Sequence, residues 1–355
     1  MIETFKAFVI DKDESGKVTP TFKQLSPTDL PKGDVLIKVH YSGINYKDAL
    51  ATQDHNAVVK SYPMIPGIDL AGTIVESEAP GFEKGEQVIV TSYDLGVSHY
   101  GGFSEYARVK SEWIVKLPDT LTLEESMIYG TAGYTAGLAI ERLEKVGMNI
   151  EDGPVLVRGA SGGVGTLAVL MLNELGYKVI ASTGKQDVSN QLLELGAKEV
   201  IASTGKQDVS NQLLELGAKE VIDRLPVEDN HKKPLASSTW QACVDPVGGE
   251  GINYVTKRLN HSGSIAVIGM TAGNTYTNSV FPHILRGVNI LGIDSVFTAM
   301  KLRQRVWRRL AKDLKPENLH EIKQVITFDE LPEQLNKVIK HENKGRIVID
   351  FGVDK

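Results

Sequence analysis

Short runs of apolar, β-branched residues, separated by Pro, Gly and Asp, fill the first third of the chain. Runs of this kind are typical of β-strands. We expect strands at residues 6–10, 34–44, 70–77, 86–93, 104–109 and 112–118. From residue 121 the apolar positions take a helical spacing, and Thr122 with Glu125 three residues later predicts a capping box at the start of that helix.

Strand-like and helix-like segments alternate in the middle of the chain. The expected strands are GPVLVRGA (153–160) and YKVIAST (177–183), and each precedes an expected helix, at 163–176 and 187–197. Later strands are expected in QACVDPVG, GSIAVIGM and VNILGID. This alternation predicts an α/β fold with a doubly wound parallel sheet, the Rossmann arrangement.

The tail of the chain returns to a helix over 299–315 and ends in a strand-like segment, GRIVIDFG, over 345–352. We expect that strand to rejoin the first domain. The predicted organisation is a discontinuous β-rich catalytic domain, 1–128 and 296–355, and a dinucleotide-binding domain over 129–295.

A glycine-rich turn, GASGGVG at 159–165, joins the first strand of the alternating region to its helix. Backbone N–H groups at a helix N-terminus bind a dinucleotide pyrophosphate, and small residues allow its close approach. The spacing is GxxGxxG in place of the commoner GxGxxG, but the strand–turn–helix context is met; a tight turn without a ligand is the alternative. The predicted phosphate-binding residues are Ser161, Gly162, Gly163, Val164 and Gly165.

The end of the second strand of this region distinguishes NADPH from NADH. NAD-binding sites usually place Asp or Glu there, whereas this chain has Ser182, Thr183 and Lys185. Hydroxyl groups and a cation suit a 2′-phosphate, which a carboxylate would repel. We therefore expect NADPH; a solvated loop is the alternative for Lys185.

An identical tandem repeat lies in the same region. Residues 179–199 are repeated without a change at 200–220, so Ser203, Thr204 and Lys206 carry the same chemistry again. Two units are too few for a solenoid. Because the third strand of a Rossmann sheet lies at its edge, we expect the second copy to add a strand there, with the first copy in register behind the glycine-rich turn. The alternative register loops out the first copy.

Composition indicates a cytoplasmic enzyme without a membrane segment. Hydrophobic residues make up 41% and charged residues 24%, and the net charge of −6 gives no reason to expect a nucleic-acid or membrane partner. The single cysteine, Cys243, excludes an internal disulfide and a Cys-based zinc site and fits a reducing compartment. Charges occur too early for a signal peptide, and no apolar run reaches the ~20 residues of a membrane helix.

Several motifs resemble those of the medium-chain dehydrogenase/reductase superfamily, in its zinc-independent quinone-oxidoreductase branch. They are SGINYKD (42–48), PGIDLAG (66–72), YGTAGYTA (129–136), GASGGVG (159–165), VDPVGG (244–249) and LRGVNILGIDS (285–295). The resemblance is to the YhdH/YhfP group, which includes acryloyl-coenzyme A reductases, and it covers the chain except one copy of the repeat. It implies a GroES-like β-rich domain, a Rossmann domain and a homodimer.

The resemblance also implies chemistry without a metal. Zinc-dependent relatives carry Gly-His-Glu where this chain has Gly67, Ile68 and Asp69, and they hold a catalytic Cys near the position of Asn45. The His residues of this chain are scattered without metal-ligand spacing. Without a Lewis acid, hydride addition to conjugated carbonyls or quinones is favoured.

Candidate catalytic residues come from the first domain and the tail. By resemblance, Asn45, Asp48, Asp69 and Arg346 line the active site. Asp69 lies in an apolar stretch, where a carboxylate needs a partner, so Arg346 either forms a structural ion pair with it or faces the substrate beside it. Tyr46 is the candidate proton donor for the enolate left by hydride addition, with packing as the alternative.

Further residues are assigned to the nicotinamide. By resemblance, they are Thr131 and the backbone around Gly269 and Gly292. The main hypothesis is thus an NADPH-dependent reductase of α,β-unsaturated carbonyl compounds, with acryloyl-coenzyme A as the substrate that fits best. A quinone reductase is the alternative in the same class, and an NADPH-binding interaction or RNA-binding protein is the alternative in another.

The helix expected over 301–315 has two different faces. One carries an apolar stripe, Leu302, Val306, Leu310 and Leu314. The other is basic, with Arg305, Arg308, Arg309 and Lys312. We expect that face to be solvated. It could instead bind the phosphates of coenzyme A. Contact with nucleic acid is a third alternative, which the overall acidity of the chain disfavours.

Overall fold

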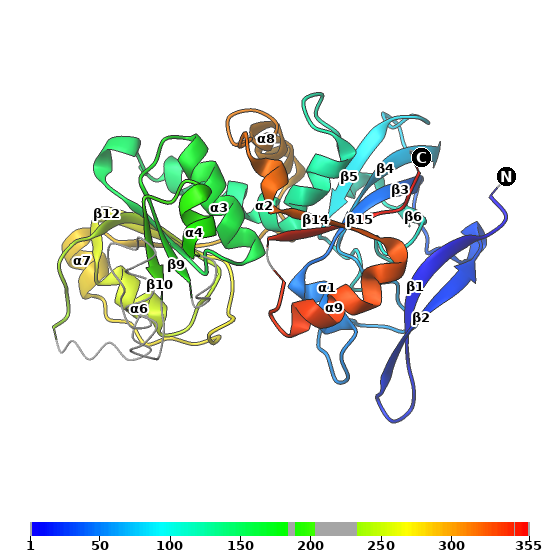
Figure 1. Ribbon diagram of the computed structural model, residues 1–355, viewed down its shortest axis with the longest axis horizontal. Coiled ribbons are helices and arrows are strands. Elements are labelled where there is room, and N and C mark those ends of the chain that lie inside the picture. The colour runs from blue at the N-terminus through cyan, green and yellow to red at the C-terminus, as the bar shows by residue number, and fades with distance from the viewer. Residues whose placement is uncertain (1, 184–188, 203–232, 344, 354–355) are drawn as a thin grey trace. The chain divides into compact units, whose positions relative to one another are not determined.

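The computed structural model describes residues 2–183, 189–202, 233–343 and 345–353. The chain separates into two compact units (Figure 1). Unit 1 comprises Met1–Ala132, Ser295–Ala311 and Leu319–Lys355, and unit 2 comprises Gly133–Asp294 and Lys312–Asn318. None of the helices in the described ranges has the length and apolar character that crossing a bilayer requires.

Unit 1 is built on a seven-stranded sheet with the order β14-β15-β3-β4-β5-β7, in which β6 also pairs with β3. All pairings are antiparallel except that of β14 with β15. The strands are β3 (Val35–Gly43), β4 (Asp69–Ser77), β5 (Gln87–Thr91), β6 (Tyr106–Val109), β7 (Ile114–Lys116), β14 (Lys323–Thr327) and β15 (Arg346–Asp350). The pairing of β15 with β3 places the C-terminal strand in the sheet of the N-terminal segment.

Unit 1 also contains a two-stranded ribbon and two helices that lie outside the seven-stranded sheet. The ribbon consists of β1 (Phe5–Lys12) and β2 (Val18–Leu25), and the helices α1 (Tyr46–Ala51) and α9 (Leu331–Ile339) lie side by side (Figure 1). Phe8, Phe103 and Ile349 belong to the apolar core beneath them. Neither β2 nor these two helices was predicted, because β2 exposes most of its residues and α1 is too short to show a period.

The helix predicted from residue 121 is α2 (Leu123–Lys145). Its predicted capping box is confirmed: the Thr122 backbone N–H donates to Glu125 Oε2 at 2.9 Å, and the Glu125 N–H donates to Thr122 Oγ1 at 3.1 Å. The helical geometry breaks at Gly130, which has φ +49° and ψ −151°. Only glycine adopts such a backbone conformation readily.

The basic tail helix is shorter than expected, and a charged residue outside the predicted stripe is buried along with the stripe. Helix α8 spans Met300–Leu310 in place of the predicted 299–315. Val306 and Leu310 of the predicted stripe are buried, but Leu302 is only partly buried. Arg303, which was not predicted to be inside, is fully buried. A charged group can be buried only where hydrogen bonds replace its water, which the spacing of apolar residues does not reveal.

Unit 2 is built on a six-stranded parallel sheet with the order β10-β9-β8-β11-β12-β13. Counted along the chain this is 3-2-1-4-5-6, the Rossmann order, as the alternation predicted. The strands are β8 (Val155–Arg158), β9 (Val179–Thr183), β10 (Glu199–Ala202), β11 (Trp240–Asp245), β12 (Leu259–Val267) and β13 (Asn289–Gly292). Among the described residues this unit contains the second part of α2, from Gly133, and the helices α3 (Gly163–Glu174), α4 (Ser189–Glu194), α6 (Gly251–Thr256) and α7 (Phe281–Arg286).

The tandem repeat keeps its first copy in the position expected for it. Strand β9, from the first copy, pairs with β8 behind the glycine-rich turn. Val200, Ile201 and Ala202, which open the second copy, pair with β9 as the edge strand β10. Ser203, Thr204, Lys206 and the strand expected at 221–223 lie outside the described residues.

Candidate functional site

A buried carboxylate, Asp69, is the centre of a polar cluster in unit 1. It stands at the start of β4, and its side chain is fully buried. Asn45 Nδ2 donates to Asp69 Oδ2 at 2.7 Å. Thr131 donates twice, from its backbone N–H to Oδ2 at 2.8 Å and from its hydroxyl to Oδ1 at 2.5 Å. Three donors from two distant segments thus hold the carboxylate.

The helix break at Gly130 is what makes the Thr131 amide accessible to Asp69. Inside an unbroken helix that N–H would donate to a carbonyl one turn earlier. A methyl group at Gly130 would overlap Asp69 Oδ2 and lie 2.9 Å from Arg346 Nη2. The position therefore requires glycine twice, for its positive φ and for the space that these two side chains occupy.

Asp48, the second carboxylate, is bound mainly by the local backbone. Its Oδ2 accepts from the Asn45 backbone N–H at 2.8 Å, as the third residue of a capping box does for the N-cap of α1. Its Oδ1 accepts from the Ile68 N–H at 2.9 Å. Asp48 therefore ties the start of α1 to the segment before β4. The pair Asn45 and Asp48, three residues apart, was a sequence signal for this cap.

Arg346 joins the cluster through Asn45 and the main chain. Its Nε donates to the Ile128 carbonyl at 2.9 Å, and its Nη1 donates to the Ile44 carbonyl at 3.1 Å and to Asn45 Oδ1 at 3.4 Å. The expected direct ion pair with Asp69 is replaced by a link through Asn45. Nη2 has no hydrogen-bond partner among the described residues.

Burial raises the pKa of both carboxylates of the cluster and lowers that of its guanidinium. Burial, together with the nearby Asp69 carboxylate, raises the pKa of Asp48 to about 7. Burial also raises the pKa of Asp69, while the two hydrogen bonds from Thr131 and the charge of Arg346 oppose the rise. Burial lowers the pKa of Arg346, and the two carboxylates oppose that shift. The cluster holds two carboxylates against one guanidinium.

Tyr46 lies next to this cluster in sequence but outside its hydrogen bonds. It is the first residue of α1 and is 41% exposed. Its ring stacks on the His341 ring, with 5.2 Å between centroids and 17° between planes. The phenol thus has a fixed ring plane at the surface of unit 1, and no sequence pattern indicated His341 as its neighbour.

The glycine-rich turn of unit 2 begins α3 as predicted. The Gly162 N–H donates to the Gly159 carbonyl at 3.0 Å, and Gly162 is the N-cap of the helix. The N–H groups of the first helical turn have no partner within the helix, so those of Gly163, Val164 and Gly165 are suited to an anion. A methyl group at Gly162 would meet only the Gly159 oxygen, at 3.4 Å, which leaves this side of the turn open.

The last glycine of the turn has a different task. A methyl group at Gly165 would overlap the Gly159 carbonyl oxygen and approach Ala160 Cα to 2.8 Å. Gly165 therefore allows α3 to pack closely against the end of β8. Thr166 Oγ1 strengthens this contact by donating to the Ala160 carbonyl at 3.0 Å.

The end of β9 lies beside the turn. Ser161 and Thr183 share a hydrogen bond between their hydroxyls at 2.7 Å, and the Ser182 carbonyl accepts from the Ala160 N–H at 2.9 Å. The structure thus brings the predicted phosphate and ribose residues together. Lys185 lies outside the described residues.

A buried ion pair that sequence reasoning missed stabilises the same edge of unit 2. Arg158 Nη1 donates to Asp245 Oδ2 at 2.6 Å, and Asp245 Oδ1 accepts from the Val247 N–H at 2.8 Å and the Gly248 N–H at 3.1 Å. Burial raises the pKa of Asp245, and the charge of Arg158 opposes the rise. The pair joins the ends of β8 and β11, which are neighbours in the sheet.

The two glycines assigned to the nicotinamide lie after β12 and in β13. Gly269 follows β12 closely, and a methyl group there would overlap the Pro246 carbonyl oxygen. Gly292 ends β13, and no atom of the described residues lies within 4 Å of the position that its methyl group would take. They follow adjacent strands of unit 2, while Thr131 belongs to unit 1.

The donor groups of the described residues do not fit a zinc ion. No three His, Cys, Asp or Glu side chains gather into a metal-binding group within those ranges. Both carboxylates of the cluster already accept N–H groups and are near a guanidinium. Burial raises the pKa of the Cys243 thiol well above its ordinary value, which disfavours a thiolate ligand.

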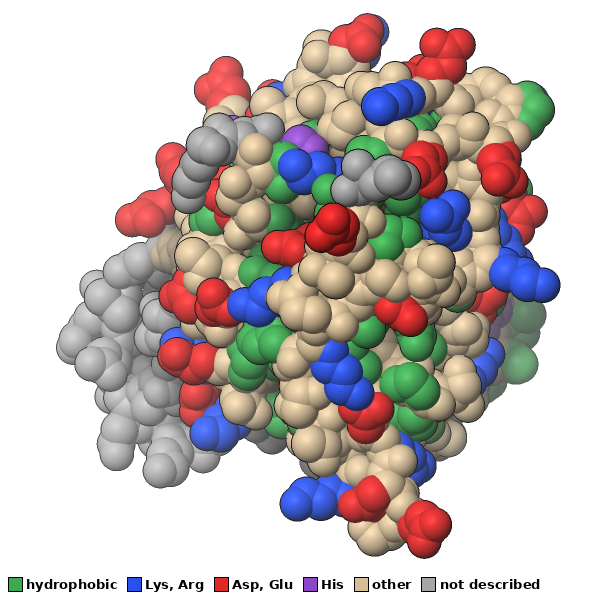
Figure 2. Space-filling view, turned by 90° about the vertical axis from the view of Figure 1, so that its right-hand side faces the viewer, with side chains coloured by type: hydrophobic (Ala, Val, Ile, Leu, Met, Phe, Trp, Pro, Cys, Tyr) green, Lys and Arg blue, Asp and Glu red, His purple; other side chains and the backbone are tan. Residues whose placement is uncertain are grey.

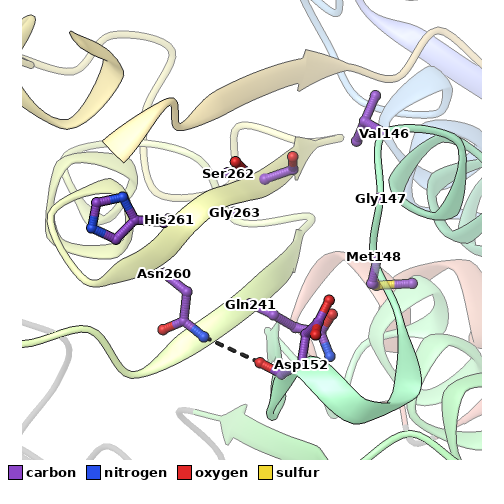
Figure 3. Close-up of a pocket in the computed structure, with 10 residues that line it drawn as sticks. Val146, Gly147, Met148, Asp152, Gln241, Asn260, His261, Ser262 and Gly263 are labelled. Atoms are coloured by element: carbon purple, nitrogen blue, oxygen red, sulfur yellow. Dashed lines mark hydrogen bonds between the residues drawn. The ribbon is translucent and has the colours of Figure 1, made fainter. Parts of the chain in front are cut away.

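A pocket of about 350 Å³ lies elsewhere in unit 2 (Figure 3). It is lined by the segment after α2, by the start of β11 and by residues 260–264 of β12. Gln241 in its wall has its amide occupied by Asn149 and Gly153, and Asn260 Nδ2 donates to the Asp152 carbonyl at 3.3 Å. None of the site residues predicted from the sequence lines this pocket, and the side-chain amides of Gln241 and Asn260 already form hydrogen bonds within the chain.

The basic side chains of α8 do not form a uniform face. Arg303 is buried, while Arg305 and Arg308 are exposed and Arg309 is partly buried. On the face of the molecule shown in Figure 2, acidic and basic side chains are interspersed with apolar ones. Neither observation indicates the continuous basic surface that nucleic-acid binding requires.

Comparisons with known proteins agree with both units. Residues 31–119 match the family model described as "Alcohol dehydrogenase GroES-like domain", and residues 163–312 match the one described as "Zinc-binding dehydrogenase". The chain is 45% identical to "Putative quinone oxidoreductase YhfP" of Bacillus subtilis, over 98% of this chain and 99% of that protein. It is 40% identical to "Acrylyl-CoA reductase AcuI" of Ruegeria pomeroyi, again over 98% and 99%.

Solved structures of similar proteins have the same fold. The crystal structure of Bacillus subtilis yhfP with NAD bound is similar with a TM-score of 0.89 and 44% identity, over 98% of this chain and 99% of that one. The yhdH oxidoreductase of Salmonella enterica in complex with NADP is similar with a TM-score of 0.87 and 36% identity, over 98% and 99%. Both the GroES-like β-rich domain and the Rossmann domain are therefore confirmed.

Proposed function

The chain belongs to the medium-chain dehydrogenase/reductase family, in its zinc-independent YhdH/YhfP group, and on that premise we propose that it is an NADPH-dependent reductase of electron-poor C=C bonds. Its best substrate is an enoyl thioester of the acrylyl-coenzyme A type. The observation that carries the proposal is the open glycine-rich turn of unit 2, together with 40% identity to a named acrylyl-CoA reductase.

The cofactor is a nicotinamide dinucleotide held by the turn. The N–H groups of Gly163, Val164 and Gly165 suit its pyrophosphate, because no described side chain lies within 4 Å of the position that a methyl group at Gly162 would take. NADPH is favoured because β9 ends in Ser182 and Thr183, where a carboxylate would repel a 2′-phosphate. One similar structure holds NAD and another holds NADP, so the family accommodates both.

The reaction divides between the cofactor and the side chains of unit 1. When bound, the nicotinamide supplies a hydride for the β-carbon of the substrate. Thr131, fixed at its amide and hydroxyl by Asp69, orients the nicotinamide, and the amide of Asn45 is oriented by Asp69 and Arg346. Tyr46 holds, at its phenol oxygen, the proton that the α-carbon of the substrate needs. Its stacking on His341 keeps the ring oriented.

No step of this mechanism uses zinc. One matching family model is described as zinc-binding, but the carboxylates of Asp48 and Asp69 are committed to N–H donors and Cys243 is a buried thiol. The substrate carbonyl must therefore be activated by hydrogen bonds. Such activation suffices for conjugated acceptors, whose double bond is already electron-poor.

A quinone reductase is the second candidate. It is favoured by 45% identity to a protein named as a quinone oxidoreductase. A quinone accepts hydride at an electron-poor ring, so the same cofactor site serves it. The two candidates differ in what must follow, since an enoyl thioester needs a proton on carbon and a quinone needs one on oxygen.

The proposed assembly is a homodimer formed through unit 2. Strand β13 is an edge of the six-stranded sheet, where backbone groups are open to pairing with another strand. The preceding segment exposes large apolar side chains, namely Val280, Phe281, Ile284 and Leu285. An exposed edge next to an apolar patch supports association of two copies through the same surface. Ile284→Lys should then give a monomer in light scattering.

The cytoplasm is the proposed location. Cys243 is a buried free thiol, and no second cysteine exists to form a disulfide within the chain. Proteins of oxidising compartments rely on disulfides far more often.

Oxidation of NADPH with a panel of acceptors tests the proposal. The panel contains acrylyl-coenzyme A, crotonyl-coenzyme A, simple enones and quinones. The highest kcat/KM is expected with acrylyl-coenzyme A; preference for quinones would select the second candidate. Tight NADPH binding without turnover of any acceptor would instead favour an interaction protein.

A substitution at Tyr46 tests the proton donor. Tyr46→Phe keeps the ring that stacks on His341 and removes only the hydroxyl. Turnover of enoyl thioesters should fall by about 10²-fold or more while NADPH affinity is unchanged. An equal fall with quinones would indicate that the residue acts by packing.

A further inference from the structure

Ser92 is a buried serine at a backbone position that favours glycine. It follows β5, is 3% exposed, and has φ +65°, in the left-handed region. Its N–H donates to the Ile68 carbonyl at 2.7 Å. Holding a non-glycine residue in this conformation costs backbone free energy, which indicates that the serine side chain has a role at this position.

The hydroxyl of Ser92 is the start of a chain that ends on a carboxylate. Ser92 Oγ lies 3.0 Å from Thr131 Oγ1, and Thr131 Oγ1 lies 2.5 Å from Asp69 Oδ1. A hydroxyl has one hydrogen, and Thr131 gives its own to Asp69. Ser92 must therefore be the donor to Thr131. The direction of both bonds is set by the carboxylate at the end.

Arg303 of α8 holds the turn that presents Ser92. Its Nη1 donates to the carbonyl and the hydroxyl of Thr91, at 3.1 and 2.9 Å. Its guanidinium lies over the Tyr93 ring, 4.4 Å from the centroid, and its Nε donates to the Tyr93 hydroxyl at 3.2 Å. The residues on both sides of Ser92 are thus fixed by one buried side chain, which explains why Arg303 is inside.

The same guanidinium binds a second segment of unit 1. Nη2 donates to the carbonyls of Ser295 and Val296, at 2.9 and 3.0 Å. Arg303 therefore joins the end of β5 to the residues that enter α8. The Ser92 turn cannot relax without loss of these charge-assisted hydrogen bonds.

We infer that Ser92 is a positioning residue for the reduction, which fixes the Thr131 hydroxyl in the orientation that receives the nicotinamide. The inference rests on the proposed function, in which Thr131 orients that ring. Ser92 acts through Thr131 and touches neither substrate nor cofactor. Without the Ser92 hydroxyl, Thr131 Oγ1 loses a donor that helps Asp69 to fix its rotamer.

Two substitutions separate the hydroxyl from the backbone. Ser92→Ala removes the hydroxyl and keeps a Cβ at φ +65°, whereas Ser92→Gly removes the hydroxyl and also relieves the backbone. Both substitutions should weaken NADPH binding equally if the hydroxyl positions Thr131. Ser98→Ala is the control, since it removes an exposed hydroxyl that bonds to Asp94. Thermal unfolding of all three variants checks that they fold.

Binding of two nucleotides measures the effect without an acceptor. NADPH contains the nicotinamide, and adenosine 2′,5′-bisphosphate lacks it. In both Ser92 variants the Kd of NADPH should rise about tenfold, the loss expected for one neutral hydrogen bond, while the Kd of the bisphosphate stays within twofold. An unchanged Kd for NADPH, or an equal rise for both ligands, overturns the inference.

A double substitution completes the test. In a Thr131→Val background, Ser92→Gly should add nothing to the loss of NADPH affinity, because the two residues act as one unit. If the two substitutions together raised the Kd of NADPH by the product of their separate increases, the inference would be overturned. Because these are binding measurements, an enzyme that binds NADPH and reduces no acceptor refutes the proposed function and leaves the Ser92 result readable.

Discussion

The polar cluster of unit 1 and the glycine-rich turn of unit 2 are built on opposite principles. In the cluster, Asp69 accepts three hydrogen bonds from Asn45 and Thr131, so its side chains are committed to one another. In the turn, the N–H groups that begin α3 lack helical partners, and among the described residues no side chain lies against Gly162. The cluster is therefore a rigid scaffold, and the turn is a prepared binding surface. Loss of the central carboxylate should therefore reduce stability, whereas covering the open side of the turn should reduce cofactor affinity.

Loss of the central carboxylate should have the largest effect on stability. Asp69→Ala leaves Asp48 as the carboxylate near the buried Arg346 and removes the acceptor that the Asn45 and Thr131 donors share. Removing one member of a buried charged group costs about 3–5 kcal/mol. Chemical denaturation should show this loss, and the exposed Asp119→Ala should change stability by less than ~0.5 kcal/mol. A loss below about 1 kcal/mol for Asp69→Ala would mean that the cluster is not a scaffold.

The second carboxylate of the cluster should reveal itself through pH. Its pKa is about 7 in the folded chain against an ordinary value of 3.8, so between these values the folded state holds the proton more tightly than the unfolded state. Its contribution to stability therefore falls as pH rises through this window, by at most about 1.4 kcal/mol per pH unit. The stability difference between wild type and Asp48→Asn should follow that slope and level off above pH 7. A wild type that becomes more stable relative to Asp48→Asn as pH rises would contradict the raised pKa.

A pair of glycine substitutions in the turn separates folding from binding. Gly165→Ala forces α3 away from β8 and should cost about 1–3 kcal/mol of stability. Gly162→Ala meets only ordinary contacts, so stability should hold within ~0.5 kcal/mol. Its methyl group nevertheless covers the open side of the turn, and the Kd of NADPH should rise about tenfold. Unchanged affinity in Gly162→Ala would place the phosphate elsewhere.

Cofactor choice should show the smallest effect. NADPH should bind at least tenfold more tightly than NADH, which needs only ~1.4 kcal/mol of differential binding. Titration calorimetry at fixed ionic strength measures it, and Lys185→Ala and Lys206→Ala, made separately, show which copy of the repeat contributes. Only Lys185→Ala should weaken NADPH binding, because β9 of the first copy pairs with β8 behind the turn. Equal affinities for the two nucleotides would contradict the preference.

The two regions also differ in how far the sequence predicts them. The turn occupies seven consecutive residues between a strand and a helix, so local rules suffice, and the order of the sheet follows from the strand–helix alternation. The residues of the cluster could be named from family resemblance, but their bonds could not. The link from Arg346 to Asn45, the break at Gly130 and the burial of Arg303 depend on segments up to 302 residues apart. Such contacts are set by tertiary packing, which no local period encodes.

Transfer of a labelled hydride is the direct test of the proposed reduction. The protein, treated with a chelator, is given acrylyl-coenzyme A and NADPH that carries deuterium at the transferable position of its nicotinamide. We expect full activity and a saturated thioester with one deuterium on the β-carbon, identified by mass spectrometry and NMR. Product without deuterium, or activity that returns only when zinc is added, would contradict it.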